Sequence, residues 1–146
     1  AMHENEAEWL EKALVNLPPA ATKWGWILRS VMMMAKPMIK IPATGVDVVL
    51  NNENILLTEY GIPGRIIYTP GHSSGSVSLL LDTGDAFVGD LAMNRFPLRL
   101  SAGLPIFAED IEKVKESWEL LLTLGAKTIY PAHGKPFSSD VFRNAL

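Results

Sequence analysis

The sequence has 146 residues, the size of one ordinary domain, and it is 48% hydrophobic and 20% charged, as globular proteins usually are. The formal net charge of −3, without any run of Lys or Arg, argues against nucleic acid as a partner. Because the chain has no cysteine, it can form neither a disulfide nor a thiolate zinc site. We therefore expect a single cytoplasmic domain over residues 1–146, in which any metal ligands are His and carboxylates.

Two helices are predicted in the first third of the chain. Residues 5–16 have acidic side chains at the start and apolar ones at helical spacing, and two prolines follow them. Residues 22–36, with Thr22 as the cap, are apolar around much of the circumference, so this helix needs cover on more than one side. Its longest apolar run, Val31 to Ala35, is too short to span a bilayer, and we expect no membrane partner. The first residues do not have the pattern of a signal peptide.

From residue 46 the pattern changes to short runs of β-favouring residues separated by turn residues. Strands are predicted over 46–50, 55–58, 65–69, 77–81 and 86–88. Asp82 and Asp85 flank Thr83-Gly84, and we interpret them as residues of a hairpin turn rather than metal ligands. Residues 89–108 have no clear period and predict a long loop, which in a compact domain often has a function.

The last part of the chain contains the strongest helix pattern. Residues 109–124 have one apolar stripe, acidic residues in the first turn and Gly125 after the end. A short strand over 128–130, a loop over 131–136 and a short helix over 138–145 are predicted to follow.

Three side chains that can bind metals each follow a predicted strand and stand beside small or turn-forming residues. His72 lies in segment 69–76, Asp90 follows a strand and Gly89, and His133 lies between Ala132 and Gly134. A tight loop after a strand lets such a side chain project from the edge of the sheet. Neutral imidazole and carboxylate suit zinc, iron or manganese at hydrolytic sites. A single His in this context is usually a turn or surface residue, but three such positions together indicate a metal site.

The motifs at 69–72, 89–90 and 131–134 resemble the C-terminal motif series of the metallo-β-lactamase superfamily, and the resemblance covers about residues 62–137. It implies an α/β chain of the α+β type, the C-terminal half of an αββα sandwich. In that half, one mostly antiparallel sheet carries helices on one face. The resemblance also implies that residues 17–45 are a helical insertion near the active site.

The resemblance assigns roles to the three side chains. In the superfamily two metal ions, usually zinc, share a carboxylate and a hydroxide, so His72 would bind the first ion, Asp90 would bridge and His133 would bind the second. The metal-bound hydroxide would then attack a small ester, thioester, lactone or related substrate. No residue outside the metal ligands is assigned to catalysis.

The first motif of the superfamily, His-x-His-x-Asp-His, supplies four further ligands and does not occur in this sequence. Because Asp90 is shared, the chain offers each metal two ligands where the full site offers four. We expect a truncated chain that begins just after the missing half, with low metal occupancy and no activity alone. The uncovered sheet face predicts a homodimer.

Two hypotheses about function stay open: part of a binuclear hydrolase, or a non-catalytic interaction module derived from one. A nuclease of the same superfamily is disfavoured by the acidic charge. His3, the one histidine outside the motifs, is interpreted as part of a segment that holds no ligand in the superfamily, rather than as a replacement ligand. Further side chains could face a substrate, although packing or solvation explains them more simply. They are Trp24, Trp26 and residues 32–34, near a substrate entrance, and Arg95 and Arg99, near an anionic group.

Overall fold

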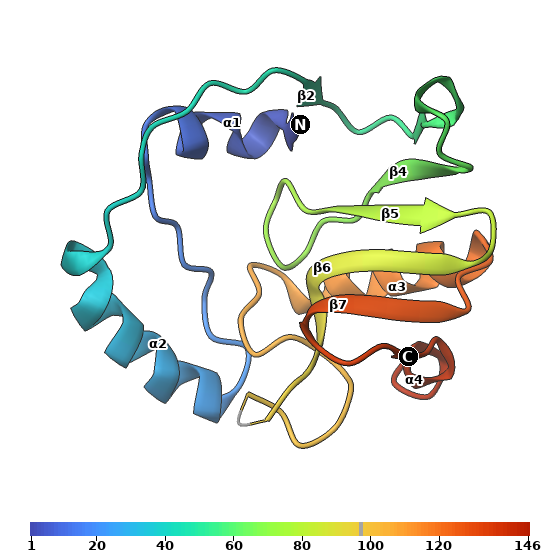
Figure 1. Ribbon diagram of the computed structural model, residues 1–146. Helices are drawn as coiled ribbons and strands as arrows, with labels where there is room; N and C mark the ends of the chain where they lie inside the picture. Colours follow the sequence, from blue (N-terminus) through green and yellow to red (C-terminus); the bar gives the residue numbers. More distant parts are fainter. Residues whose placement is uncertain (97) are drawn as a thin grey trace.

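The structure, a computed structural model, describes residues 1–96 and 98–146, so Pro97 in the predicted loop lies outside the described residues. It contains a six-stranded sheet, a two-stranded parallel sheet and helices around them (Figure 1). In chain order the elements are β1 (Met2–His3), α1 (Glu4–Glu11), α2 (Lys23–Ala35), η1 (Lys36–Met38), β2 (Val49–Leu50), β3 (Ile55–Leu56), η2 (Thr58–Tyr60), β4 (Gly64–Tyr68), β5 (Val77–Leu81), β6 (Asp85–Asn94), α3 (Ile111–Thr123), β7 (Thr128–Gly134), β8 (Phe137–Ser138) and α4 (Asp140–Arg143).

The six-stranded sheet follows chain order from β3 to β8, and every neighbouring pair is antiparallel except β6 and β7. A parallel pair needs a long crossover connection, which here contains α3. Since β4 and β6 are both antiparallel to β5, strands β4, β6 and β7 all run in the same direction. Their carboxyl ends therefore meet at one edge of the sheet. The predicted mostly antiparallel sheet is confirmed.

Side chains on the two faces of the sheet differ in their surroundings. On one face Leu80, Ala86 and Ile129 lie in adjacent register and are buried against α3 and α4. On the opposite face Leu79, Phe87 and Tyr130 are also paired in register, and the Phe87 and Tyr130 rings stack with centroids 4.7 Å apart. This second face is open to solvent, since Phe87 is 43% exposed. In the part of the chain that the structure describes, helices cover one face only, as the sequence predicts, and α3 lies behind the sheet in Figure 1.

Helix α3 supplies the centre of the hydrophobic core. Asp110 caps it by accepting hydrogen bonds from the backbone N–H groups of Glu112 and Lys113. Val114, Trp118 and Leu121 follow at helical spacing and are all fully buried. The Trp118 ring also stacks on Phe142 of α4, with centroids 4.0 Å apart. The helix predicted over 109–124 is confirmed, with slightly narrower bounds.

The N-terminal helices bear out the sequence only in part. Helix α2 begins after Thr22, whose side chain accepts from the Gly25 N–H, as predicted. Helix α1 ends at Glu11, however, so the prediction that it reaches residue 16 was wrong. Ala13 has a positive φ of 53°, and the Leu10 carbonyl accepts from the N–H of Thr44, a contact with a distant segment that the local pattern does not contain. Among the described helices, none has the length and hydropathy needed to cross a bilayer.

Several predicted strand boundaries also need correction. Strands β2 and β3 are shorter than the runs 46–50 and 55–58. Strands β6 and β7 are longer than predicted, so that Asp90 and His133 lie within strands and the loop begins after Asn94. The reason is the parallel pairing of β6 with β7, which continues past Gly89 through irregularities in the register. At the C-terminus α4 is a single turn rather than a helix over 138–145.

Candidate metal centre

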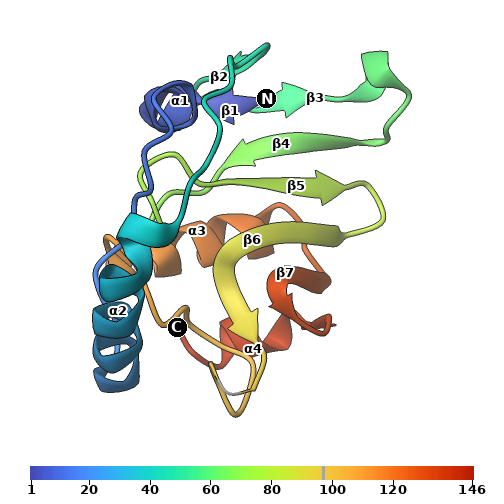
Figure 2. The same ribbon diagram turned by 60° about the vertical axis from the view of Figure 1, so that its left-hand side comes forward.

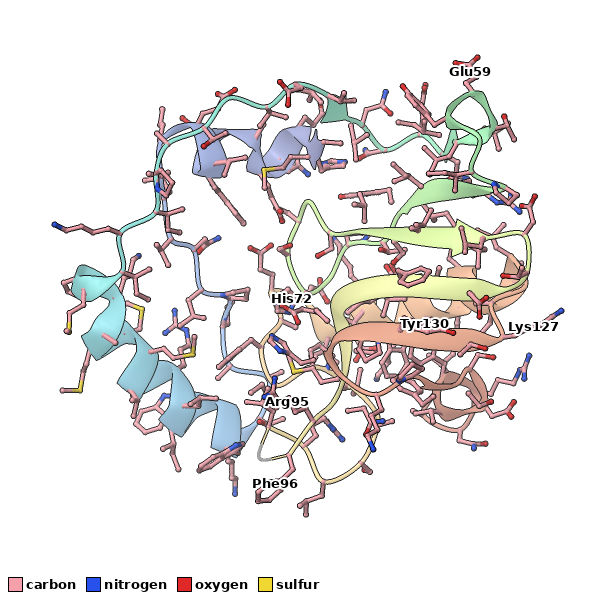
Figure 3. All side chains as sticks on the ribbon, in the orientation of Figure 1. Glu59, His72, Arg95, Phe96, Lys127 and Tyr130 are labelled. Atoms are coloured by element: carbon pink, nitrogen blue, oxygen red, sulfur yellow. The ribbon has the colours of Figure 1, made fainter. Side chains whose placement is uncertain are left out.

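The three candidate ligands come together at the edge of the sheet where β4, β6 and β7 end or pass. Asp90 lies between the two histidines: its Oδ2 is 3.8 Å from His72 Nε2, and its Oδ1 is 3.5 Å from His133 Nε2. Figure 3 places His72 at this edge, on the side facing α2. The sequence therefore predicted correctly that the three motifs converge.

The loop that carries His72 is held by a backbone hydrogen bond between its ends and by helix α3. Its ends are joined by the Thr69 N–H donating to Ser76 O, and Ser117 of α3 donates to Pro70 O at 2.7 Å. Gly71 has a φ of +136°, and a Cβ there would stand 2.4 Å from Val114 N. Only glycine allows this backbone to approach the start of α3 so closely.

The His72 ring has a defined orientation. Its Nδ1 is 2.8 Å from the Phe107 carbonyl oxygen. A carbonyl can only accept, so Nδ1 carries the proton and donates it. In the neutral ring Nε2 then keeps its lone pair, and this is the atom that faces Asp90. Metal-binding histidines are commonly oriented by such a hydrogen bond on the opposite nitrogen.

Asp90 is the most unusual side chain of the group. Its Oδ1 is the one buried side-chain N or O atom, among those described, without a hydrogen-bond partner. A buried polar atom without a partner costs about 1–3 kcal/mol, and a carboxylate oxygen costs more. The cost disappears when a cation binds the oxygen. The donor set therefore fits divalent metals that accept imidazole nitrogen and carboxylate oxygen.

The described residues contain no group of three or more His, Cys, Asp or Glu side chains that could hold a metal ion. The two histidines lie at different oxygens of one carboxylate, so each possible metal position has one imidazole and one carboxylate oxygen from this chain. This arrangement agrees with the two ligands per metal expected from the sequence.

A pocket of about 330 Å³ opens beside the three side chains. Apart from the two histidines, Asp90 and Asn16, all of its lining residues are apolar. These are Leu17, Pro18, Leu28, Met32, Met93, Leu98, Ile106 and Phe107. Met32 thus lies at the pocket, as the substrate-entrance hypothesis requires. Neither tryptophan of α2 lines it, and Trp26 is 66% exposed, so the preferred interpretation that these residues merely pack was wrong for Trp26.

The two loop arginines do not line this pocket. Arg99 donates to the carbonyl oxygens of Ser101 and Leu104, which fixes its side chain within its own loop. Arg95 lines a separate hollow with Lys135. The hypothesis that they meet an anionic substrate finds no support in this geometry.

His3 has a structural role. It is 1% exposed, stacks on Tyr68 at 4.6 Å and shares a hydrogen bond of 3.0 Å with the Asn52 side chain. Its Nδ1 accepts from the Asn5 N–H at the start of α1. The interpretation of His3 as a non-ligand is confirmed. Thr83 and Asp85 likewise form a hydrogen-bonded turn around Gly84, as predicted.

Sequence reasoning missed the contribution of residue 107. Its carbonyl orients His72, but a backbone group has no signature in residue type. The apolar residues at 17, 28 and 106 were missed for a related reason, because pocket walls look like core residues in a sequence.

Comparison with known proteins agrees with these observations. A family model described as "Metallo-beta-lactamase superfamily" matches residues 1–133. A curated protein of Drosophila melanogaster, "Beta-lactamase-like protein 2 homolog", is 32% identical over 84 residues. That alignment covers 58% of this chain and 26% of the fly protein.

Solved structures show the same fold. The BLEG-1 B3 metallo-beta-lactamase has a TM-score of 0.67 and 19% identity, covering 98% of this chain and 61% of its own. An archaeal metallo-beta-lactamase superfamily protein from Sulfolobus tokodaii has a TM-score of 0.62 and 22% identity, covering 99% of this chain and 55% of its own. The chain thus spans a little more than half the length of these solved relatives, and about a quarter of the curated one.

Proposed function

Because the chain belongs to the metallo-beta-lactamase superfamily, we propose that the whole protein is a metal-dependent hydrolase whose binuclear site is held in part by His72, Asp90 and His133. One observation carries this proposal: a carboxylate stands between two imidazole Nε2 atoms, and one of its oxygens is buried without a partner. The three residues lie in a pocket, where a substrate could reach them.

The residues fit two neighbouring metal positions. His72 Nε2 with Asp90 Oδ2 would form one, and His133 Nε2 with Asp90 Oδ1 the other. Zinc suits these donors, and iron or manganese is compatible with them. When bound, divalent metal supplies an acidified water molecule and a Lewis acid for a carbonyl oxygen.

Other groups of this chain orient a metal ligand and line the pocket. The Phe107 carbonyl keeps the His72 ring in one tautomer, so no rearrangement is needed before ligation. Leu28, Met32 and Ile106 give the pocket an apolar wall, which limits water around the reacting group. This lining favours a small uncharged ester, thioester, lactone or related substrate over a strongly anionic one.

By ligand count this chain alone should bind metal weakly. We expect the purified 146-residue chain to contain well under one zinc per chain by mass spectrometry and to hydrolyse no generic ester or thioester. A longer gene product that supplies the remaining ligands should bind two ions and hydrolyse such substrates. Stoichiometric zinc in the short chain, with activity abolished by His72→Ala, would contradict the two-ligand count. Absence of metal from the longer product would contradict the proposal that the whole protein is a metal-dependent hydrolase.

The open face of the sheet supports a second candidate, an interaction module that assembles through this face. Leu79, Phe87 and Tyr130 form a row in register across three strands there, and Phe87 is 43% exposed. An apolar row of this kind is typical of a surface that another chain covers.

We expect the isolated chain to form a homodimer at micromolar concentration, measured by multi-angle light scattering. Phe87→Ser should shift it to monomer, because the substitution removes the most exposed ring of the row. Leu56→Ser, at a still more exposed position (64%) on the edge strand β3, serves as the control and should leave the dimer intact. A monodisperse wild-type monomer would exclude assembly through this face.

A further inference from the structure

Helix α2 presents an apolar surface to solvent on the side away from the pocket. Ile27, Val31, Met34 and Met38 follow one another at spacings of four, three and four, which places them on one face of the helix and its continuation η1. They are 51%, 58%, 82% and 85% exposed. Trp26 stands beside this stripe. A soluble chain rarely leaves so large an apolar face uncovered.

The charge around this stripe is of one sign. Residues 12–46 contain five basic residues and no acidic one, whereas the rest of the chain contains eight basic and 16 acidic residues. Lys23, Lys36 and Lys40 are exposed at the two ends of the stripe. Arg29 points inward and donates to the carbonyls of Pro18 and Leu17. The exposed part of α2 and η1 is therefore apolar and cationic within an otherwise acidic chain.

The position of α2 separates this stripe from the rest of the molecule. Figure 1 shows α2 beyond the edge of the sheet, and the turned view of Figure 2 also shows it outside the strands. Its inner side chains Leu28 and Met32 line the pocket of the candidate metal centre. A second copy of α2 would bring positive charge against positive charge.

We propose that the outer face of residues 23–41 binds the surface of an anionic lipid bilayer. Trp and Met on one side of a helix, flanked by lysines, fit the boundary between headgroups and acyl chains. Lysine side chains extend toward lipid phosphates while their methylene stems stay on apolar surface. The helix would lie in the interface without crossing it, so the proposal departs from the expectation of no membrane partner, which rested on the lack of a spanning segment in the sequence. This proposal is independent of hydrolysis.

The test is cosedimentation of the 146-residue chain with unilamellar vesicles. One set is pure phosphatidylcholine, and the other contains about 30 mol% phosphatidylglycerol. We expect binding to the anionic set at least roughly tenfold stronger, weakening as NaCl rises from about 0.1 M to about 0.5 M. Trp fluorescence should shift to the blue on binding, because Trp26 leaves water.

Variants locate the contact. The pair Trp26→Ser with Met34→Ser, and separately Lys36→Glu with Lys40→Glu, should each weaken binding by roughly tenfold or more. Leu56→Ser and Lys127→Glu are matched exposed controls far from α2, and they should bind as the wild type does. Circular dichroism checks that every variant is folded.

Three results would overturn the proposal. The first is no vesicle binding by the folded wild type. The second is equal loss in the control variants, which would indicate non-specific adhesion. The third is self-association that the α2 variants abolish without any vesicle binding, which would assign the stripe to a protein contact.

Discussion

Replacing Asp90 with asparagine is expected to weaken zinc binding to the whole protein by more than about a hundredfold, and to lower hydrolysis at least as much. The reason is that one carboxylate serves both histidines, so the substitution removes negative charge from two metal positions at once. Isothermal titration with zinc and kcat/KM on one responsive ester measure the two effects. Asp82→Asn, an exposed turn carboxylate, is the control and should change neither.

The same substitution should stabilise the metal-free chain. Asp90 Oδ1 is buried without a hydrogen-bond partner, and a neutral amide is cheaper to bury than a carboxylate. We expect the free energy of unfolding in the presence of a chelator to rise by about 1 kcal/mol in urea titration. A variant that loses both stability and metal would show that Asp90 is a structural residue rather than a ligand.

Trp118→Ala is expected to give the largest loss of stability, about 3–5 kcal/mol in the free energy of unfolding. The indole is fully buried, stacks on Phe142 and donates to the Leu91 carbonyl at 3.1 Å. Its removal leaves a cavity and an unpartnered carbonyl next to Asp90. Because the free energy of unfolding of a domain is only about 5–15 kcal/mol, the variant would lose a large part of its stability.

The control for this experiment is Trp26→Ala, which removes the same side chain from a position 66% exposed. It should change the free energy of unfolding by less than about 0.5 kcal/mol. Trp118→Phe keeps a ring in the core but loses the donor to Leu91, and we expect an intermediate loss of about 1–3 kcal/mol. Equal effects at positions 118 and 26 would contradict the assignment of the core.

The parts of the site that could be predicted from the sequence are those that depend on side-chain chemistry. His72, Asp90 and His133 carry their chemistry in their side chains, and strand order brings them to one edge, so the sequence sufficed to predict that they converge. The tautomer of His72 depends on a backbone carbonyl 35 positions away, which no local pattern contains. The pocket wall from α2 likewise depends on how distant segments pack.

The fold shows the same division between local and distant causes. Segment 77–81 and the helix around Val114 were predicted closely because alternation and helical spacing are local signals. Helix α1 is shorter than predicted because Ala13 has a positive φ, and the Leu10 carbonyl there accepts from the distant Thr44 N–H as well as from Ala13. Strand β6 is longer because a neighbouring strand extends it. In both of these errors, a contact between segments far apart in the sequence lies at the boundary of the element.

The parallel pair β6 and β7 has a consequence for the order of folding events. Asp85 of β6 pairs with Thr128 of β7, so the strands join only after the long connection through α3 has closed. Contacts of such long sequence separation form slowly. Asp90 and His133 therefore stay apart until the six-stranded sheet is almost complete. Capture of metal by this pair would mark the end of folding rather than nucleate it.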